Sequence, residues 1–486
     1  MIHQFLIEHA KKNTVSFHMP GHKGAGIYSR YDYNEFLNRF MDCDITEIPG
    51  ADNLFQTEGI IRDAQLTYAT LYDVDHSYLL INGTSGGLIA AILTSVSPEK
   101  KLIMARNCHK AVFNALTLGN IQPVYAYPEQ LEGQEIAGPV SVEEIQRLLE
   151  ENPEAQAVIL PSPNYYGICS DIKAIADAVH QAGKVLIVDQ AHGAHLHFFH
   201  KYGAGDGMPQ SAESCGADIV VNSTHKTLAS FTQSAILNLN SNRVDRYHLE
   251  DKLQAIQSTS PSYLLMGSLD INAELLINHG KALMEEWKKN LDDFYRRADR
   301  IPGLSIMKAP NLDRTKINLD MSRLGFSGAD LERELNERDV FPELYTGNLL
   351  MCMTGIGNTG EHMERLLDAL AEISETNRDS FDESGLEASA ITSMPKVGEP
   401  QHNMTRNTLP AQAKFVEVPK DKMYTPLDEA AEQICAGSII PYPPGIPLIC
   451  PGEAFTAEIV QYIQFLRKSG EKVIGVTDAG TVPVGK

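Results

Sequence analysis

A lysine stands shortly after an apolar run near the middle of the 486-residue chain. Residues 217–221 form the run, and Ser223-Thr224-His225-Lys226 follows it. Lysine is normally solvated and is rarely fully buried. A single lysine here is by default an ordinary loop residue. The alternative is a lysine placed for its amine, which can form a Schiff base where the surroundings lower its pKa.

Three more polar segments follow predicted strands, and each also has an ordinary explanation. Residues 82–87 join a strand to a helix, where small residues and free N–H groups suit an anion, although a capped glycine-rich turn would look the same. Asp189 closes an apolar strand and needs a partner there, or it caps a turn. His109, in the segment 106–110, can stack on a flat ring or merely open a helix.

The four segments together meet the needs of one cofactor. Residues 82–87 and Ser223 offer a phosphate cradle, His109 a stacking ring and Lys226 an amine. Asp189 offers a carboxylate that can keep a pyridine nitrogen protonated, so that the ring accepts electrons from a bond broken at the substrate Cα. The combination predicts pyridoxal 5′-phosphate (PLP).

An alternating pattern of elements must position these segments. From about residue 77, predicted strands at 77–81, 101–105, 121–127, 155–160, 184–188 and 218–221 alternate with helical stretches. This order predicts an α/β fold with a mostly parallel sheet covered by helices. Ligands bind beyond the C-terminal ends of such strands, where all four segments fall.

The pattern changes after residue 261. A long helix is predicted at 264–300, followed by a mixture of strands and helices. Residues 376–412 are poor in large apolar side chains and rich in Ser, Asn, Pro and Glu. We predict an N-terminal arm (1–45), a PLP-binding large domain (46–300), a small α/β domain (301–375), a linker or surface excursion (376–412) and a C-terminal α+β domain (413–486).

Composition excludes some classes of partner. The formal net charge of −22 disfavours nucleic acid and anionic membranes, and no apolar run reaches the length of a membrane span. Seven scattered cysteines without a C-x-x-C motif favour a reducing compartment, so a cytoplasmic protein is expected. His192 and His195 stand without further ligands at metal spacing, and no metal is predicted.

At this point the sequence resembles the PLP-dependent Orn/Lys/Arg decarboxylases of the aspartate-aminotransferase fold (fold type I). The resemblance covers most of the chain. It is carried by residues 18–23 (His-Met-Pro-Gly-His-Lys), 46–50, 82–87, 106–110, 188–195, 223–226, 259–263 and 441–447. It implies a Schiff-base Lys226, a pyridine partner in Asp189, a stacking His109 and further cofactor contacts from Thr84, Ser85, Gly86, His192, Ser223 and His225.

The resemblance also implies a substrate contact, an assembly and two departures. Glu343 is similar to an acidic family position near the substrate, or it is a solvated strand-end residue. The early motif at 18–23 suggests the short form without an N-terminal wing domain, and a homodimer or higher homo-oligomer with active sites at the interface. Gln190 replaces a common Glu, so a carboxylate beside the cofactor is expected to be lost. Residues 409–412 also depart from the family pattern.

These features predict α-decarboxylation of a small cationic amino acid. Arginine is favoured over lysine or ornithine, and the product is agmatine or a diamine for polyamine metabolism. His225 or Lys226 would return a proton to Cα. Two alternatives stay open. One is another fold type I enzyme, a transaminase or an α-oxoamine synthase. The other is a silent PLP- or polyamine-binding regulatory paralogue, to which Gln190 gives weight.

Overall fold

The computed structural model describes residues 1–12, 14–131, 136–377, 415–441, 446–468 and 472–486. Almost all of the predicted linker at 376–412, with the unusual residues 409–412, therefore lies outside the described residues. So does the centre of the segment 441–447.

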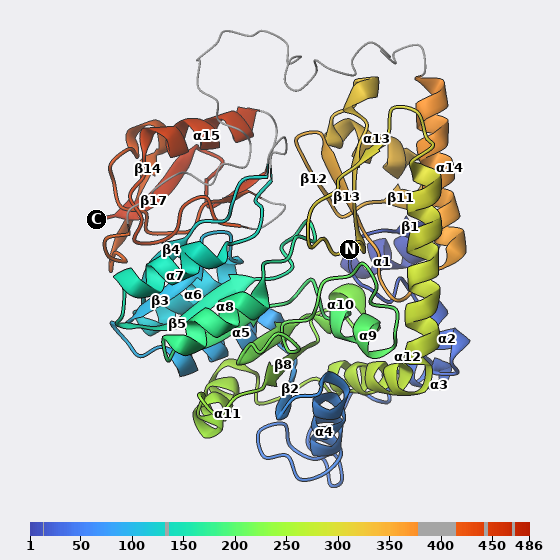
Figure 1. Cartoon of the computed structure of the whole chain (residues 1–486), viewed down its shortest axis with the longest axis horizontal. Helices are drawn as coiled ribbons and strands as arrows, with labels where there is room; N and C mark the ends of the chain where they lie inside the picture. Colours follow the sequence, from blue (N-terminus) through green and yellow to red (C-terminus); the bar gives the residue numbers. More distant parts are fainter. Residues whose placement is uncertain (13, 132–135, 378–414, 442–445, 469–471) are drawn as a thin grey trace.

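A seven-stranded sheet forms the main body (Figure 1). Its order is β2 (His76–Leu80), β8 (Ala235–Leu239), β7 (Ile219–Asn222), β6 (Val185–Asp189), β5 (Ala155–Pro161), β3 (Lys101–Ala105) and β4 (Gln122–Ala126). The pairs from β7 to β4 are parallel, whereas β8 is antiparallel to both β7 and β2. The predicted mostly parallel α/β sheet is confirmed.

Helices follow the strands as the alternating pattern predicted. They are α5 (Gly83–Ser95), α6 (Lys110–Gly119), α7 (Val142–Glu151) and α8 (Ile172–Gln181). Neighbouring residues of one strand enter different cores, because successive side chains point to opposite faces. In β2, Leu79 belongs to the core that includes the long helix α12 (Tyr263–Ala298), and Leu80 belongs to the core under α5 and α6.

A smaller antiparallel sheet lies after α12, in the order β12 (Leu344–Thr346), β13 (Leu349–Met353), β10 (Lys316–Asp320) and β9 (Ser305–Ile306). Helices α13 (Gly328–Glu337) and α14 (Gly360–Thr376) accompany it, and both begin with a capping box. The N-terminal arm reaches this unit, because β1 (Val15–Ser16) pairs in parallel with β11 (Val340–Phe341).

The C-terminal residues form a unit with a hydrophobic core of its own. It contains helix α15 (Ala457–Lys468) and two strand pairs, β14 (Lys422–Pro426) with β17 (Thr481–Gly485) and β15 (Ile440–Pro441) with β16 (Val473–Ile474). Figure 1 shows this unit, in red, beside the β3–β4 edge of the large sheet. The domain boundaries given above stay predictions, because one hydrophobic core includes residues of the arm, of α12 and of the small sheet.

The pattern did not predict β8, α4 (Ile60–Tyr72) or α11 (Arg246–Ile256). Strand β8 breaks the helix–strand alternation, since it follows β7 after a loop and the four-residue helix α10 (Thr224–Thr227). Among the described helices, none combines the length and the apolar character needed to cross a membrane.

Candidate active site

Four strands bring the predicted polar segments to one edge of the large sheet. Strands β2 and β7 both pair antiparallel with β8, so they run in the same direction as β3 and β6. The segments at 82–87, 106–110, 189–195 and 223–226 all follow the C-terminal ends of these strands. The predicted meeting place is confirmed.

Lys226 lies in α10 and points its amine at a histidine. Its Nζ is 2.9 Å from His192 Nε2 and 5.5 Å from the centre of the Tyr165 ring. Burial lowers the pKa of Lys226, and Lys316 acts in the same direction, whereas Asp189 and Glu343 raise it. The amine is therefore easier to deprotonate than a solvated lysine, which a nucleophilic role requires.

Asp189 ends β6 and is 5% exposed. Its Oδ1 accepts a hydrogen bond of 3.1 Å from the backbone N–H of Ala191. Burial raises the pKa of this carboxyl group, and the charge on Lys226 opposes that effect. A buried carboxylate of this kind is stabilised by a protonated nitrogen placed against it.

Three imidazoles near Lys226 are held neutral. Burial and then the charge on Lys226 lower the pKa of His109 to about 3, and the same two causes hold that of His192 well below its usual value. Burial also lowers the pKa of His225 to about 4, although a hydrogen bond to the Ser234 carbonyl opposes the change. That bond, 2.8 Å from His225 Nδ1, places a proton on Nδ1 and leaves Nε2 as the acceptor of the neutral ring.

The residues predicted to hold phosphate lie at two neighbouring strand ends. Thr84 and Ser85 are partly exposed and Gly86 is buried in the first turn of α5, whose N-terminal N–H groups favour an anion. Ser223 is 1% exposed, and among the described residues its hydroxyl oxygen has no hydrogen-bond partner. An orphaned buried hydroxyl of this kind fits a ligand oxygen.

Models of one protein family match most of the chain. The model of the Orn/Lys/Arg decarboxylase major domain matches residues 2–316, and that of the C-terminal domain of the same family matches residues 396–479. An arginine decarboxylase of Bacillus subtilis is 31% identical, over 98% of this chain and 95% of its own length.

The chain belongs to the Orn/Lys/Arg decarboxylase family.

More distant relatives carry the same fold. The lysine decarboxylase LdcA of Pseudomonas aeruginosa is 24% identical, over 95% of this chain and 75% of its own length. The solved structure of lysine decarboxylase A from the same organism superposes with a TM-score of 0.73 at 21% identity, covering 99% of this chain and 80% of that one. The structural match confirms the predicted fold class.

The small sheet and the N-terminal arm bring Glu343, which the resemblance singled out, and Lys23, which it did not, toward Lys226. Glu343, between β11 and β12, accepts a hydrogen bond of 2.9 Å from the backbone N–H of Met19 and acts electrostatically on Lys226. Lys23, in the family motif at 18–23, donates to the carbonyls of His18 and Met353. Burial lowers the pKa of Lys23 to about 7, with Glu343 opposing.

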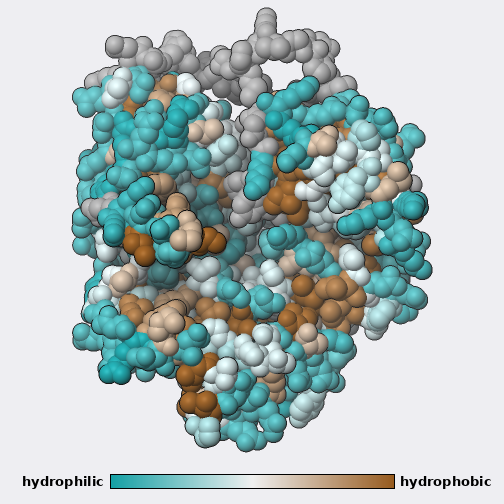
Figure 2. Space-filling model, turned by 180° about the vertical axis from the view of Figure 1, so that it is seen from behind, coloured by the Kyte–Doolittle hydropathy of each residue, from teal (hydrophilic) through white to brown (hydrophobic). Residues whose placement is uncertain are grey.

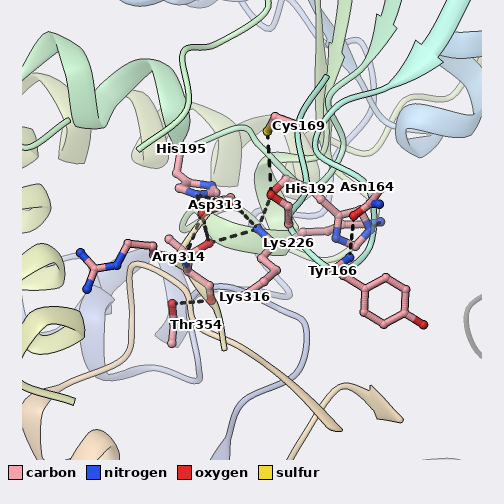
Figure 3. A network of polar contacts seen from close by, with 12 residues as sticks. Asn164, Tyr166, Cys169, His192, His195, Lys226, Asp313, Arg314, Lys316 and Thr354 are labelled. Carbon is pink, nitrogen blue, oxygen red and sulfur yellow. Dashed lines mark hydrogen bonds and ion pairs between the residues drawn. The ribbon is translucent and has the colours of Figure 1, made fainter. Parts of the chain in front are cut away.

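A buried network behind His192 was also missed (Figure 3). Lys316 and Asp313 form a fully buried ion pair of 2.8 Å, and His195 Nε2 lies 3.2 Å from the Asp313 carboxylate. A lysine that opens a predicted strand looks like a solvated strand end, so the sequence held no signal for this pair. His195 faces Asp313. Within the described parts of the chain, no group of three or more His, Cys, Asp or Glu residues is arranged to hold a metal ion.

Gln190, which follows Asp189, is held by hydrogen bonds to buried groups. Its Nε2 donates to Glu213 Oε2 and to Asn222 Oδ1, both at 2.9 Å, and its Oε1 accepts from the Ala212 N–H at 2.6 Å. All of these partners belong to a buried polar network, because residues 189 and 190, at the end of a strand, point to opposite sides. The amide of Gln190 is thus engaged in this network, and a place for position 190 beside the cofactor stays a prediction.

Proposed function

We propose that the protein is a PLP-dependent decarboxylase of a basic amino acid, with arginine as the first candidate and lysine or ornithine next. The observation that carries this proposal is the amine of Lys226, which is made easier to deprotonate by burial and lies 2.9 Å from His192. Support for arginine comes from relatives of about 30% identity that are named arginine decarboxylase. The product would be agmatine, or a diamine, for polyamine metabolism.

The described residues fit PLP. Lys226 is the amine that would take the cofactor's aldehyde, Asp189 would face its ring nitrogen, and His109 would lie against its ring. The phosphate would be held by Ser223, whose hydroxyl is otherwise unpaired, and by the first turn of α5. Further contacts are assigned to Thr84, Ser85, Gly86, His192 and His225. Bound there, PLP supplies an electron sink for the pair released when the bond from Cα to the carboxylate breaks.

Each residue has a defined task in the proposed reaction. Asp189 would hold a proton on the ring nitrogen of bound PLP, and the protonated ring would accept electrons. Burial lowers the pKa of Lys226 and so provides the free amine. The proton delivered to Cα would come from Lys226, or from His225 after its Nε2, the acceptor of the neutral ring, has taken up a proton, because Nδ1 already donates to Ser234.

Glu343 is the proposed contact for the cationic side chain of the substrate. One of its oxygens is fixed by the Met19 N–H, and it acts on Lys226, so it faces the same space as the amine. This arrangement gives the N-terminal arm a part in substrate binding. Gln190 has no such part, since its amide is engaged elsewhere.

We also propose that two copies assemble, in the cytoplasm, with active sites near the interface. Support comes from helix α1 (Ile2–Ala10), which buries none of its residues and exposes 82% of Ile2 and 67% of Phe5. Figure 2 shows hydrophobic patches among hydrophilic residues on one face of the molecule. Exposed apolar surface of this kind is typical of contact regions. All seven cysteines are free, which fits a reducing compartment.

The deciding experiment is a substrate panel. Purified protein loaded with PLP is offered arginine, lysine and ornithine, and both carbon dioxide and the amine product are measured. We expect release of carbon dioxide and agmatine from arginine, loss of bound PLP absorbance and of turnover in Lys226→Ala, and neither loss in Lys173→Ala, an exposed lysine of α8. Bound PLP without turnover on any of the three would support a silent paralogue, and transfer of the amine to a 2-oxo acid would support a transaminase.

A further inference from the structure

Lys316, at the start of β10, is a fully buried lysine with a complete set of partners. Its ammonium group donates to Asp313 Oδ2 at 2.8 Å, to Thr315 Oγ1 at 3.2 Å and to the backbone carbonyl of His192. An ammonium group has three N–H donors, so all of them are engaged. Lys316 therefore has no donor left for a cofactor or a substrate.

The partners of Asp313 fix this lysine from the other side. Thr315 Oγ1 donates to Asp313 Oδ1 at 2.7 Å, and the ring of His195 lies against the same carboxylate. The pKa of Asp313 is held below its usual range mainly by Lys316, against the opposing effect of burial. A buried ion pair is often no more stabilising than apolar side chains of similar volume, so fold stability alone explains it poorly.

The pair is connected to the proposed active-site lysine through one residue. Lys316 binds the main chain of His192, and the Nε2 of the same His192 is 2.9 Å from Lys226 Nζ. Figure 3 shows the three side chains meeting from the small sheet, from the loop after β6 and from α10. Movement of Lys316 would thus be passed to the imidazole that touches Lys226.

We propose that Lys316, held by Asp313, is a positioning residue that locks the His192 loop against the amine of Lys226 and places a fixed positive charge behind it. The proposal goes beyond the reaction itself, and it rests on the assignment of Lys226 as the cofactor lysine. It gives the small sheet a direct influence on the amine, because β10 belongs to that sheet.

The surrounding charges favour this role. Lys316 lowers the pKa of both Lys226 and His192, in the same direction as burial. Asp189 and Glu343 face Lys226 from β6 and from the β11–β12 segment and raise its pKa. The groups that act on or near the amine are therefore Asp189, His192, Lys316, Glu343, His109 and His225. Among these groups, Lys316 is the lysine whose three N–H donors all have partners, so its position is fixed.

The test uses the full chain first without and then with PLP. In the PLP-free protein, the rate at which Lys226 reacts with acetic anhydride is followed by peptide mass spectrometry from pH 6 to pH 11. In Lys316→Met we expect the pKa of the Lys226 amine to rise, so that labelling at any pH below that pKa falls by about tenfold for each unit of the rise. Lys316→Arg should recover part of the labelling, because it keeps the charge.

Two further variants keep the result decisive. Lys316→Met combined with Asp313→Asn removes the pair without leaving a lone buried charge, and it should show the same direction of change if Lys316→Met alone does not fold. Lys101→Met, at the opposite end of the sheet, removes a partly buried lysine with an ion pair to Glu154 and should leave the labelling unchanged.

Measurements on the loaded protein separate this proposal from the proposed function. The pH transition in the absorbance of bound PLP should move upward in Lys316→Met and in the double variant. If the double variant folds and Lys226 keeps the labelling profile of the natural chain, the positioning role is overturned. If Lys226→Ala still binds PLP as the natural chain does, the assignment of Lys226 fails instead, whatever the labelling profile shows.

Discussion

The amide of Gln190 and the carboxylate of Glu213 form a buried pair. Gln190 directly follows β6, the strand that ends at Asp189. Glu213 also accepts hydrogen bonds from Asn222 at 2.7 Å and from Asn238 at 2.9 Å, so the amides around it supply its donors. Position 190 is therefore matched to Glu213, and its identity as Gln bears on stability more directly than on substrate choice.

We predict that Gln190→Glu destabilises the protein by about 1–3 kcal/mol, because a second carboxylate would replace the donor to buried Glu213. Urea unfolding measures the loss. Combining the change with Glu213→Gln reverses the pair and should recover part of it. The ranking of arginine, lysine and ornithine should stay as in the natural chain. A changed ranking with unchanged stability would contradict this interpretation.

The neutral histidines predict a dependence of stability on pH. Burial lowers the pKa of His109 to about 3 and of His225 to about 4, from the ordinary 6.5. The unfolded chain takes up these protons below about pH 6.5, whereas the folded chain resists until about pH 3–4. The contribution of these histidines to the free energy of unfolding is therefore complete above pH 6.5. It falls as the pH decreases, with a slope of at most about 1.4 kcal/mol per pH unit for each group.

His225→Gln tests this dependence in the PLP-free protein. We expect the slope of the free energy of unfolding between pH 6 and pH 4.5 to become shallower by about 1 kcal/mol per pH unit. Substituting His3, which is exposed on α1, serves as the control for removing an imidazole. An unchanged slope in His225→Gln would show that the ring is already protonated in the folded chain.

At the scale of elements, two loops meet on the backbone of the Lys226 helix. The Gly21 N–H donates to the His225 carbonyl at 2.7 Å, and the Gly357 N–H donates to the Gly21 carbonyl at 3.0 Å. A Cβ on Gly21 would lie 2.5 Å from the Leu228 carbonyl oxygen, and one on Gly357 would lie 2.1 Å from that of His22. Glycine is needed here because backbone approaches backbone.

We predict that Gly21→Ala pushes the N-terminal arm away from α10. The clash involves main-chain atoms that no side-chain rotation can relieve, so we expect weaker PLP binding and a loss of stability of several kcal/mol. Gly26→Ala is the matched control, since a Cβ there meets nothing within 4 Å. Thermal unfolding and PLP titration should separate the two variants. Equal behaviour would mean that the arm does not need this contact.

The parts of the site that could be predicted from sequence are those carried by local patterns. Lys226, Asp189 and His109 each follow a recognisable apolar strand, and the parallel order of the strands brings them together. Lys316 and Lys23 could not be found in this way, because each has one partner more than a hundred positions away, His192 for Lys316 and Met353 for Lys23, and a polar residue at a strand end or turn is usually solvated. The partners of the Gln190 amide could not be predicted either, because Glu213 and Asn222 lie more than twenty positions away in the sequence.

At the scale of the whole molecule, a buried arginine ties the C-terminal unit to the large sheet. Arg106, just after β3, was part of the predicted cofactor segment, yet it donates to the carbonyls of Pro447 and Leu448, each at 2.9 Å. It also forms an ion pair of 3.1 Å with Glu453, and both side chains are fully buried. Its guanidinium lies over the rings of Phe113 and Tyr125, at 5.1 and 5.3 Å.

We predict that Arg106→Ala loosens the C-terminal unit from the rest of the molecule. Removing one partner leaves Glu453 charged and buried, which typically costs about 3–5 kcal/mol. Limited proteolysis should then release the C-terminal unit at protease concentrations that leave the natural chain intact. Arg147→Ala, which breaks exposed ion pairs with Glu144 and Glu151, should cost less than about 1 kcal/mol. Because the strand ends around Lys226 do not depend on Glu453, Arg106→Ala should still bind PLP once folded, and loss of PLP with an intact C-terminal unit would instead place Arg106 in the cofactor site.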